Sequence, residues 1–292
     1  MNGIHVTPGI GDVNTIIPVD RDVVRAQRLL NTAAATLAAG VVTDSATEHY
    51  RAGFHNPAMF VAPLMSGAVL AATTRAARRP SNGGALHASI LGMSVVTGLV
   101  GFGFHIANTS RRIGGWRSAS NVLYGAPVAA PLAATVAGTL GLIASRINRP
   151  GEPSDSAIEG RSAVLVAGLA TLGLYGTAAE AGSLHFRGAF QNPFMYAPVV
   201  VPPIAATALA GATATRSPRA RAVARRLLHF TAWLGIVGVG FHAWGIQRRM
   251  GGWRNWRQNV LAGPPLPAPP AFSGLALAGL AALQLLSPPA KR

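Results

Sequence analysis

The chain has 292 residues, of which half are hydrophobic, 25 are Lys or Arg and nine are Asp or Glu. A soluble chain of this length would carry roughly 70 charged residues, so this composition excludes an ordinary soluble domain. The sequence has no cysteine, which excludes disulfides, thiolate iron–sulfur clusters and covalently attached c-type haem in this chain.

The elements follow from the apolar stretches, taken in chain order. Residues 1–27 are mixed and polar, and we expect them to form an extramembrane arm. Apolar runs of about 18 or more residues indicate transmembrane helices. Such stretches lie near residues 28–47, 57–74, 86–109, 121–145, 162–181, 193–213, 227–247 and 266–286, with a polar linker at 146–160. The sequence therefore predicts an all-α integral membrane protein with eight transmembrane helices.

The two halves of the chain resemble each other. "HYRAGFHNPAMF" begins at His49 and "HFRGAFQNPFMY" at His185, with six of twelve positions identical. Three further pairs follow at nearly the same offset: residues 101–105 and 238–242, 111–117 and 248–254, and 121–127 and 259–265. We expect two tandem four-helix repeats, at residues 28–145 and 161–292. Because four spans is an even number, both repeats would be parallel.

The distribution of basic residues predicts the orientation. With the N-terminus inside, sixteen of the 25 basic residues face the cytoplasm, which indicates a multi-pass protein of the plasma (inner) membrane with both termini cytoplasmic. The net charge of +16 would suggest nucleic acid in a soluble protein. Here the basic residues cluster in short loops, so we expect contacts with the lipid bilayer and no nucleic-acid partner. Eight of the nine outside arginines match in pairs: Arg51/Arg187, Arg111/Arg248, Arg112/Arg249 and Arg117/Arg254.

Four histidines recur at matching positions and fall at the outer side of the predicted membrane. They are His49, His105, His185 and His242. Ionisable side chains within a membrane are costly and indicate functional sites. The alternative is that each His lies at the interface and bonds a backbone carbonyl.

Glycines share a helix face with two of these histidines. Gly98, Gly101 and His105 are spaced i, i+3 and i+7, and Gly235, Gly238 and His242 repeat this spacing. At 3.6 residues per turn, each His would stand above a strip of bare backbone roughly 10 Å long. A flat ligand such as a porphyrin could lie on that strip. Close helix–helix packing through small residues explains the glycines equally well.

These residues suggest haem b. His49 with His105, and His185 with His242, would be axial ligands. Arginines on the same side would bind propionates or, alternatively, lipid phosphate: Arg51, Arg187, Arg112 and Arg249. We expect an electron-transfer subunit of a membrane oxidoreductase complex, not a stand-alone enzyme, which links a partner dehydrogenase to quinone or another carrier.

Two alternatives remain open. Asp44 and Glu180 match each other, five residues before His49 and His185. Each carboxylate with its two histidines would make the 2-His-1-carboxylate set of a non-haem iron site, orient a ligand His, or accept a proton from a quinol. The carboxylates could also have no functional role and simply lie at the solvated ends of their helices. In the second alternative the chain is a non-catalytic membrane anchor or a transporter-like scaffold.

Overall fold

The computed structural model describes residues 21–79, 83–125, 127–147 and 156–286, and within these ranges it contains helices and turns but no strand. The all-α prediction is confirmed for this part of the chain. The first half holds α1 (Arg21–Arg51), η1 (Pro57–Phe60), α2 (Val61–Arg78), α3 (Gly84–Arg111), η2 (Gly115–Arg117), α4 (Ala119–Leu123) and α5 (Leu132–Arg146). The second half follows the same order with α6 (Ser156–Arg187), η3 (Pro193–Tyr196), α7 (Ala197–Thr215), α8 (Pro218–Gln247), η4 (Gly252–Asn255), α9 (Trp256–Ala262) and α10 (Pro270–Leu285).

Five helical segments of the described chain are long and apolar enough to cross a membrane. They are Pro57–Arg78, Gly84–Arg111, Ala157–Arg187, Pro193–Thr215 and Pro218–Gln247. This is the composition of an α-helical multi-pass membrane protein. Among the other predicted spans, α5 and α10 have only 15 and 16 residues. At 1.5 Å per residue they measure about 22 and 24 Å, less than the hydrocarbon core of about 30 Å.

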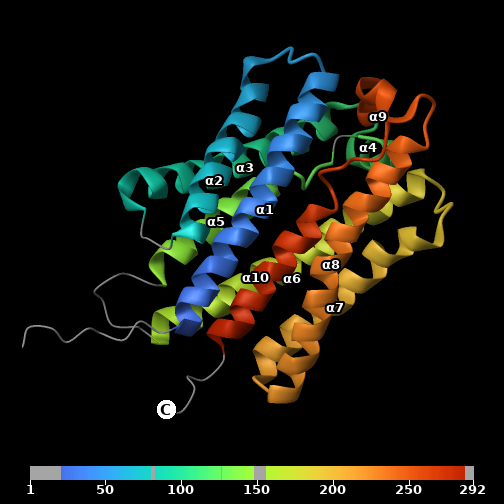
Figure 1. Cartoon of the computed structure of the whole chain (residues 1–292). Helices are drawn as coiled ribbons and strands as arrows, with labels where there is room; N and C mark the ends of the chain where they lie inside the picture. The colour runs from blue at the N-terminus through green and yellow to red at the C-terminus, as the bar shows by residue number, and fades with distance from the viewer. Residues whose placement is uncertain (1–20, 80–82, 126, 148–155, 287–292) are drawn as a thin grey trace, which may run out of the picture.

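Helices α1 and α10 lie side by side in the middle of the bundle (Figure 1). Helix α1 also packs against α2 and α5, and α10 also packs against α6 and α8. Small residues bring the two central helices together: a Cβ atom on Gly274 would lie 2.9 Å from the Leu37 side chain and 3.2 Å from the Ala33 carbonyl oxygen. Close approach through small residues is the usual packing of helices in membranes. This contact joins the first half to the second.

Several predicted boundaries are displaced. Residues 21–27 of the predicted arm belong to α1, and residues 156–160 of the predicted linker belong to α6, because a helix continues beyond its apolar part into charged residues. The predicted span 121–145 is divided into α4 and α5, since Pro127 and Pro131 have no amide hydrogen to continue a helix. Arg146 of the predicted linker is the last residue of α5, and Ile147 is its C-cap. Residues 1–20 and 148–155 lie outside the described residues.

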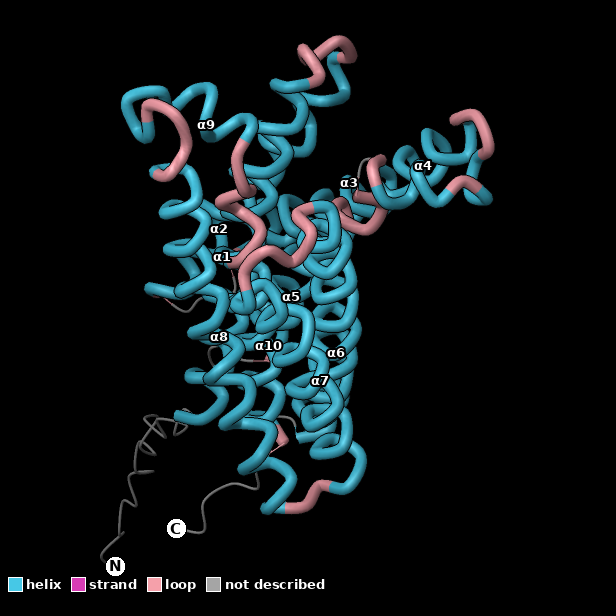
Figure 2. The backbone as a smooth tube through the Cα atoms, turned by 90° about the vertical axis from the view of Figure 1, so that its right-hand side faces the viewer, coloured by secondary structure: helices cyan, strands magenta, loops and turns pink. Residues whose placement is uncertain are grey.

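The loops that follow α1, α3, α6 and α8 lie together at one end of the bundle, where α4 and α9 also lie (Figure 2). The first residues of α1 and the last residues of α10 lie at the opposite end (Figure 1). The end with α4 and α9 therefore carries both copies of the repeated polar motifs, and we call it the histidine end.

Candidate functional site

The turn that ends α1 has the same hydrogen bonds as the turn that ends α6. The Phe54 amide donates to the carbonyl oxygen of His49 at 2.9 Å, and the Gly53 amide donates to that of Tyr50 at 2.9 Å. In the second turn, Phe190 donates to His185 at 3.1 Å and Ala189 donates to Phe186 at 2.9 Å. This pair of bonds is the Schellman motif, which places one residue in the left-handed conformation after the helix.

The next helix begins in the same way in both halves. The Asn56 side chain accepts a hydrogen bond from the Ala58 amide at 2.9 Å, and Asn192 accepts one from Phe194 at 3.0 Å. A proline follows each asparagine at the first turn. Both features are typical of helix starts.

All four repeated histidines are tied to backbone carbonyls through Nδ1. The distances are 2.5 Å from His49 to Met59, 2.6 Å from His185 to Met195, 2.8 Å from His105 to Pro127 and 2.6 Å from His242 to Pro265. A carbonyl oxygen can only accept, so each Nδ1 carries a hydrogen. In the neutral ring, Nε2 then has a free lone pair. All four rings are partly buried.

Two of the histidines also contact aromatic rings. The His49 ring meets Phe54 edge-on, with centroids 6.1 Å apart, and Phe54 stacks on Phe60 at 4.3 Å. His185 meets Phe190 at 6.1 Å, and Phe190 stacks on Tyr196 at 4.5 Å. The sequence showed the aromatic residues in both motifs but could not show these contacts, because they depend on the turn conformation.

The glycine strips are covered by the following helices. A Cβ atom on Gly98 would lie 2.3 Å from Oγ1 of Thr135, and one on Gly101 would lie 3.0 Å from the Pro131 side chain. A Cβ atom on Gly238 would lie 2.8 Å from the equivalent proline, Pro269. The glycines therefore serve the close packing of α3 on α5 and of α8 on α10. The expectation that these faces lie open to a flat ligand is wrong, because spacing defines a face but not what covers it.

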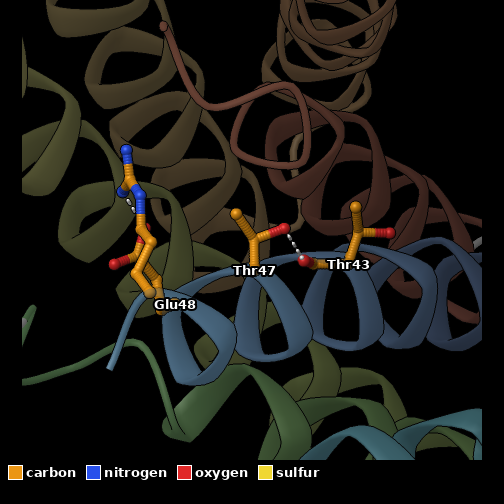
Figure 3. A network of polar contacts seen from close by, with 4 residues as sticks. Thr43, Thr47 and Glu48 are labelled. Atoms are coloured by element: carbon orange, nitrogen blue, oxygen red, sulfur yellow. Dashed lines mark hydrogen bonds and ion pairs between the residues drawn. The ribbon is translucent and has the colours of Figure 1, made fainter. Parts of the chain in front are cut away.

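The predicted propionate-binding arginines have different surroundings. Arg51 forms an ion pair with Glu48 at 2.5 Å, beside a hydrogen bond from Thr47 to the Thr43 carbonyl (Figure 3). The counterpart of Glu48 is Leu184, so this pair belongs to the first half alone. The guanidinium group of Arg187 lies 5.4 Å from the ring centre of Tyr124.

The arginines of the long loops are exposed. Arg112 and Arg249 project from the turns that follow α3 and α8. An asparagine side chain forms hydrogen bonds to the backbone of each loop. Nδ2 of Asn121 donates to the carbonyls of Ile113 and Gly115 at 3.0 and 2.9 Å. Asn259 makes the equivalent bonds at 3.1 and 2.8 Å. Both asparagines stand in the repeated "NVL" motif, and this repetition was the signal in the sequence that could have indicated their role.

Contacts across the histidine end link the two halves. Arg187 of α6 lies over Tyr124, which follows α4, and Arg257 of α9 lies 5.8 Å from the ring centre of Tyr50 in α1. Arg257 also donates a hydrogen bond to the Tyr50 hydroxyl. Sequence reasoning missed these pairs because neither tyrosine–arginine combination recurs at matching positions.

The two matched carboxylates come from different halves, Asp44 from α1 and Glu180 from α6. Asp44 and Glu180 are both partly buried. In the part of the chain that the structure describes, no group of three or more His, Asp or Glu side chains has the arrangement of a metal site.

Comparison with known proteins adds no assignment: no protein-family model, curated protein or solved structure matches this chain significantly.

Proposed function

We propose that the chain crosses the plasma membrane eight times as two tandem, parallel four-helix repeats, with both termini in the cytoplasm and the histidine end outside. The two halves have the same order of elements and the same histidine–carbonyl bonds, which supports a duplicated unit. The short helices α5 and α10 would cross the membrane together with the proline-containing segments that precede them. The excess of arginine at the end opposite the histidine end supports the orientation.

We infer that the histidine end binds b-type haem and that the protein is an electron-transfer subunit. The observation that carries this inference is shared by His49, His105, His185 and His242. Each donates from Nδ1–H to a backbone carbonyl, and Nε2 makes no hydrogen bond among the described residues. Metal-ligating histidines almost always donate their other ring N–H to a carbonyl, carboxylate or water, which fixes the tautomer. Haem b supplies reversible one-electron transfer when bound.

The surroundings limit where such a group could lie. The glycine faces below His105 and His242 are filled, so a haem could not lie there, and Nε2 of these two rings would reach it from another side. Arg112, Arg187 and Arg249 are exposed and pair with no described carboxylate, so they are available to propionates. Arg51 already pairs with Glu48 and is a weaker candidate. The exposed arginines of this end would also face a partner dehydrogenase, and quinone or another carrier would accept the electrons.

A visible spectrum of the purified protein, with metal content on the same sample, tests the proposal. We expect Soret and α bands in the reduced protein. An asparagine at position 49, 105, 185 or 242 can still donate to the same carbonyl from its amide but has no Nε2, so His105→Asn and His242→Asn should lose haem without losing the fold. His229, which is exposed on α8, provides the control, and His229→Asn should keep the bands.

The other outcomes separate the alternatives. Iron without porphyrin would favour the non-haem site of Asp44 and Glu180 with their histidines. No bound metal would leave the scaffold or anchor function. One observation favours the scaffold as second candidate: the histidine–carbonyl bonds and the glycine–proline contacts already join helix ends to loops without any ligand. In that case His105→Asn and His242→Asn would leave the activity of an associated complex unchanged.

A further inference from the structure

Phe54 and Phe190 adopt a backbone conformation that bulky residues avoid. Their φ angles are +45° and +46°, inside the left-handed region. Each follows a residue that is already left-handed, Gly53 at +74° and Ala189 at +54°. Strained backbone of this kind persists only where surrounding contacts impose it, and it concentrates at functional sites. Both copies carry the strain at the same position, so it belongs to the repeated motif.

The rings show what the strain achieves. Each phenylalanine lies between its histidine and the first turn of the next helix. Its interplanar angle to the histidine is 80° in the first half and 81° in the second, and its stacking partner is tilted by only 10° or 14°. A phenylalanine in the right-handed conformation would direct its side chain elsewhere. The left-handed turn therefore keeps the phenylalanine ring beside the histidine ring.

Two contacts together fix the histidine ring. The Nδ1–H bond to Met59 or Met195 sets the tautomer and one direction of the ring, but a single bond still permits rotation about its own axis. The edge-on phenylalanine opposes that rotation. The direction of Nε2 is then determined, and functional groups generally need such orientation within about 10–20°.

We propose that Phe54 and Phe190 are positioning residues that hold the rings of His49 and His185, so that Nε2 of each points in one fixed direction toward a metal centre. This rests on the proposed function for the identity of the group, but the positioning itself does not require the group to be bound. His105 and His242 have the carbonyl bond but no aromatic contact among the described residues, so their rings are expected to be less restricted.

Nitrogen NMR of protein labelled with ¹⁵N-histidine tests the positioning without any cofactor. In the unaltered protein we expect His49 and His185 to give sharp signals of the single Nδ1–H tautomer. In the variant Phe54→Ala/Phe190→Ala these two signals should broaden or shift toward tautomer averages, while those of His105 and His242 stay in place. The matched control is Phe230→Ala, which removes a phenylalanine that is 58% exposed on α8.

A second variant protects the test against misfolding. Phe54→Gly/Phe190→Gly removes the rings but also relieves the backbone strain, so it should fold at least as well as the alanine variant and show the same histidine signals. Unchanged His49 and His185 signals in both variants would overturn the proposal. If haem binds, the variants should retain haem content but change the low-spin EPR signal. Altered histidine signals in a protein that never binds haem would refute the proposed function and leave the positioning intact.

Discussion

The turns after α1 and α6 offer a matched exchange of residues. Position C′ of the Schellman motif is Gly53 in the first half and Ala189 in the second, and both are left-handed. Glycine is the usual residue there because it has no Cβ to clash with the following carbonyl. We predict that Gly53→Ala destabilises the protein and that Ala189→Gly stabilises it by a similar amount.

The magnitude follows from the backbone alone. A Cβ atom on Gly53 would meet no heavy atom within 4 Å, and Ala189 is exposed, so packing adds little to either change. The left-handed conformation costs a non-glycine residue about 1–2 kcal/mol. Alanine recovers about 0.4–1 kcal/mol because it restricts the unfolded chain. The net change is about 1 kcal/mol in each direction, near 2 °C in unfolding temperature for a chain of this size.

Thermal unfolding of detergent-purified variants, followed by circular dichroism, measures both changes. The exchange variant Gly53→Ala/Ala189→Gly should return close to the unaltered protein, because distant sites contribute additively. If Ala189→Gly lowers the unfolding temperature as Gly53→Ala does, the left-handed assignment at Ala189 is refuted. No shift in either variant would mean that neither turn keeps this conformation in the folded protein.

Three further predictions concern the packing and the charges. Gly98→Ala should cost about 1–3 kcal/mol by overpacking, since its Cβ would lie 2.3–2.7 Å from atoms of the α3–α5 contact. A Cβ atom on Gly103 would meet no heavy atom within 4 Å, so Gly103→Ala should not destabilise the helix. Equal losses of stability in the two variants would contradict the close α3–α5 packing at Gly98. A double-mutant cycle of Arg187→Gln and Tyr124→Leu should give a coupling of about 0.5–1 kcal/mol, and a value near zero would contradict the cation–π contact. Glu48→Gln should change stability by less than about 1 kcal/mol, because both partners of its ion pair are exposed, at 39% and 45%; unfolding curves would reveal any larger loss.

The sequence predicted those features that depend on local patterns. Asparagine followed by proline is a local pattern typical of helix starts, and Asn56 and Asn192 cap the short helices η1 and η3 that lead into α2 and α7. Composition indicated an all-helical membrane protein. Boundaries were less predictable, because hydropathy reports the apolar part of a helix and not its polar ends. The predicted span at 121–145 shows the same limit, since its prolines interrupt the helix without making the segment less apolar.

Features that depend on neighbours distant in the sequence could not be predicted. The glycines of α3 were assigned to one face correctly by spacing, but Pro131 covers that face and nothing local to Gly101 indicated it. The contact between Arg257 and Tyr50 joins residues 207 positions apart and has no matching copy. Residues that repeat in the sequence indicate features that both halves share. The contacts that join the two halves have no second copy in the sequence, so repetition cannot indicate them.

The histidine–carbonyl bonds alone do not distinguish ligation from support, because any N–H donor of suitable length would hold the same carbonyl. Asparagine performs that bracing role in the adjacent loops, where Asn121 and Asn259 each hold two carbonyls. Histidine differs from asparagine in its second ring nitrogen, which the bond leaves free. Phe54 and Phe190, whose own backbone is strained, lie beside two of these rings. A purely structural bond would need neither the second nitrogen nor the strained phenylalanine, and this is the physical argument for a site that uses Nε2.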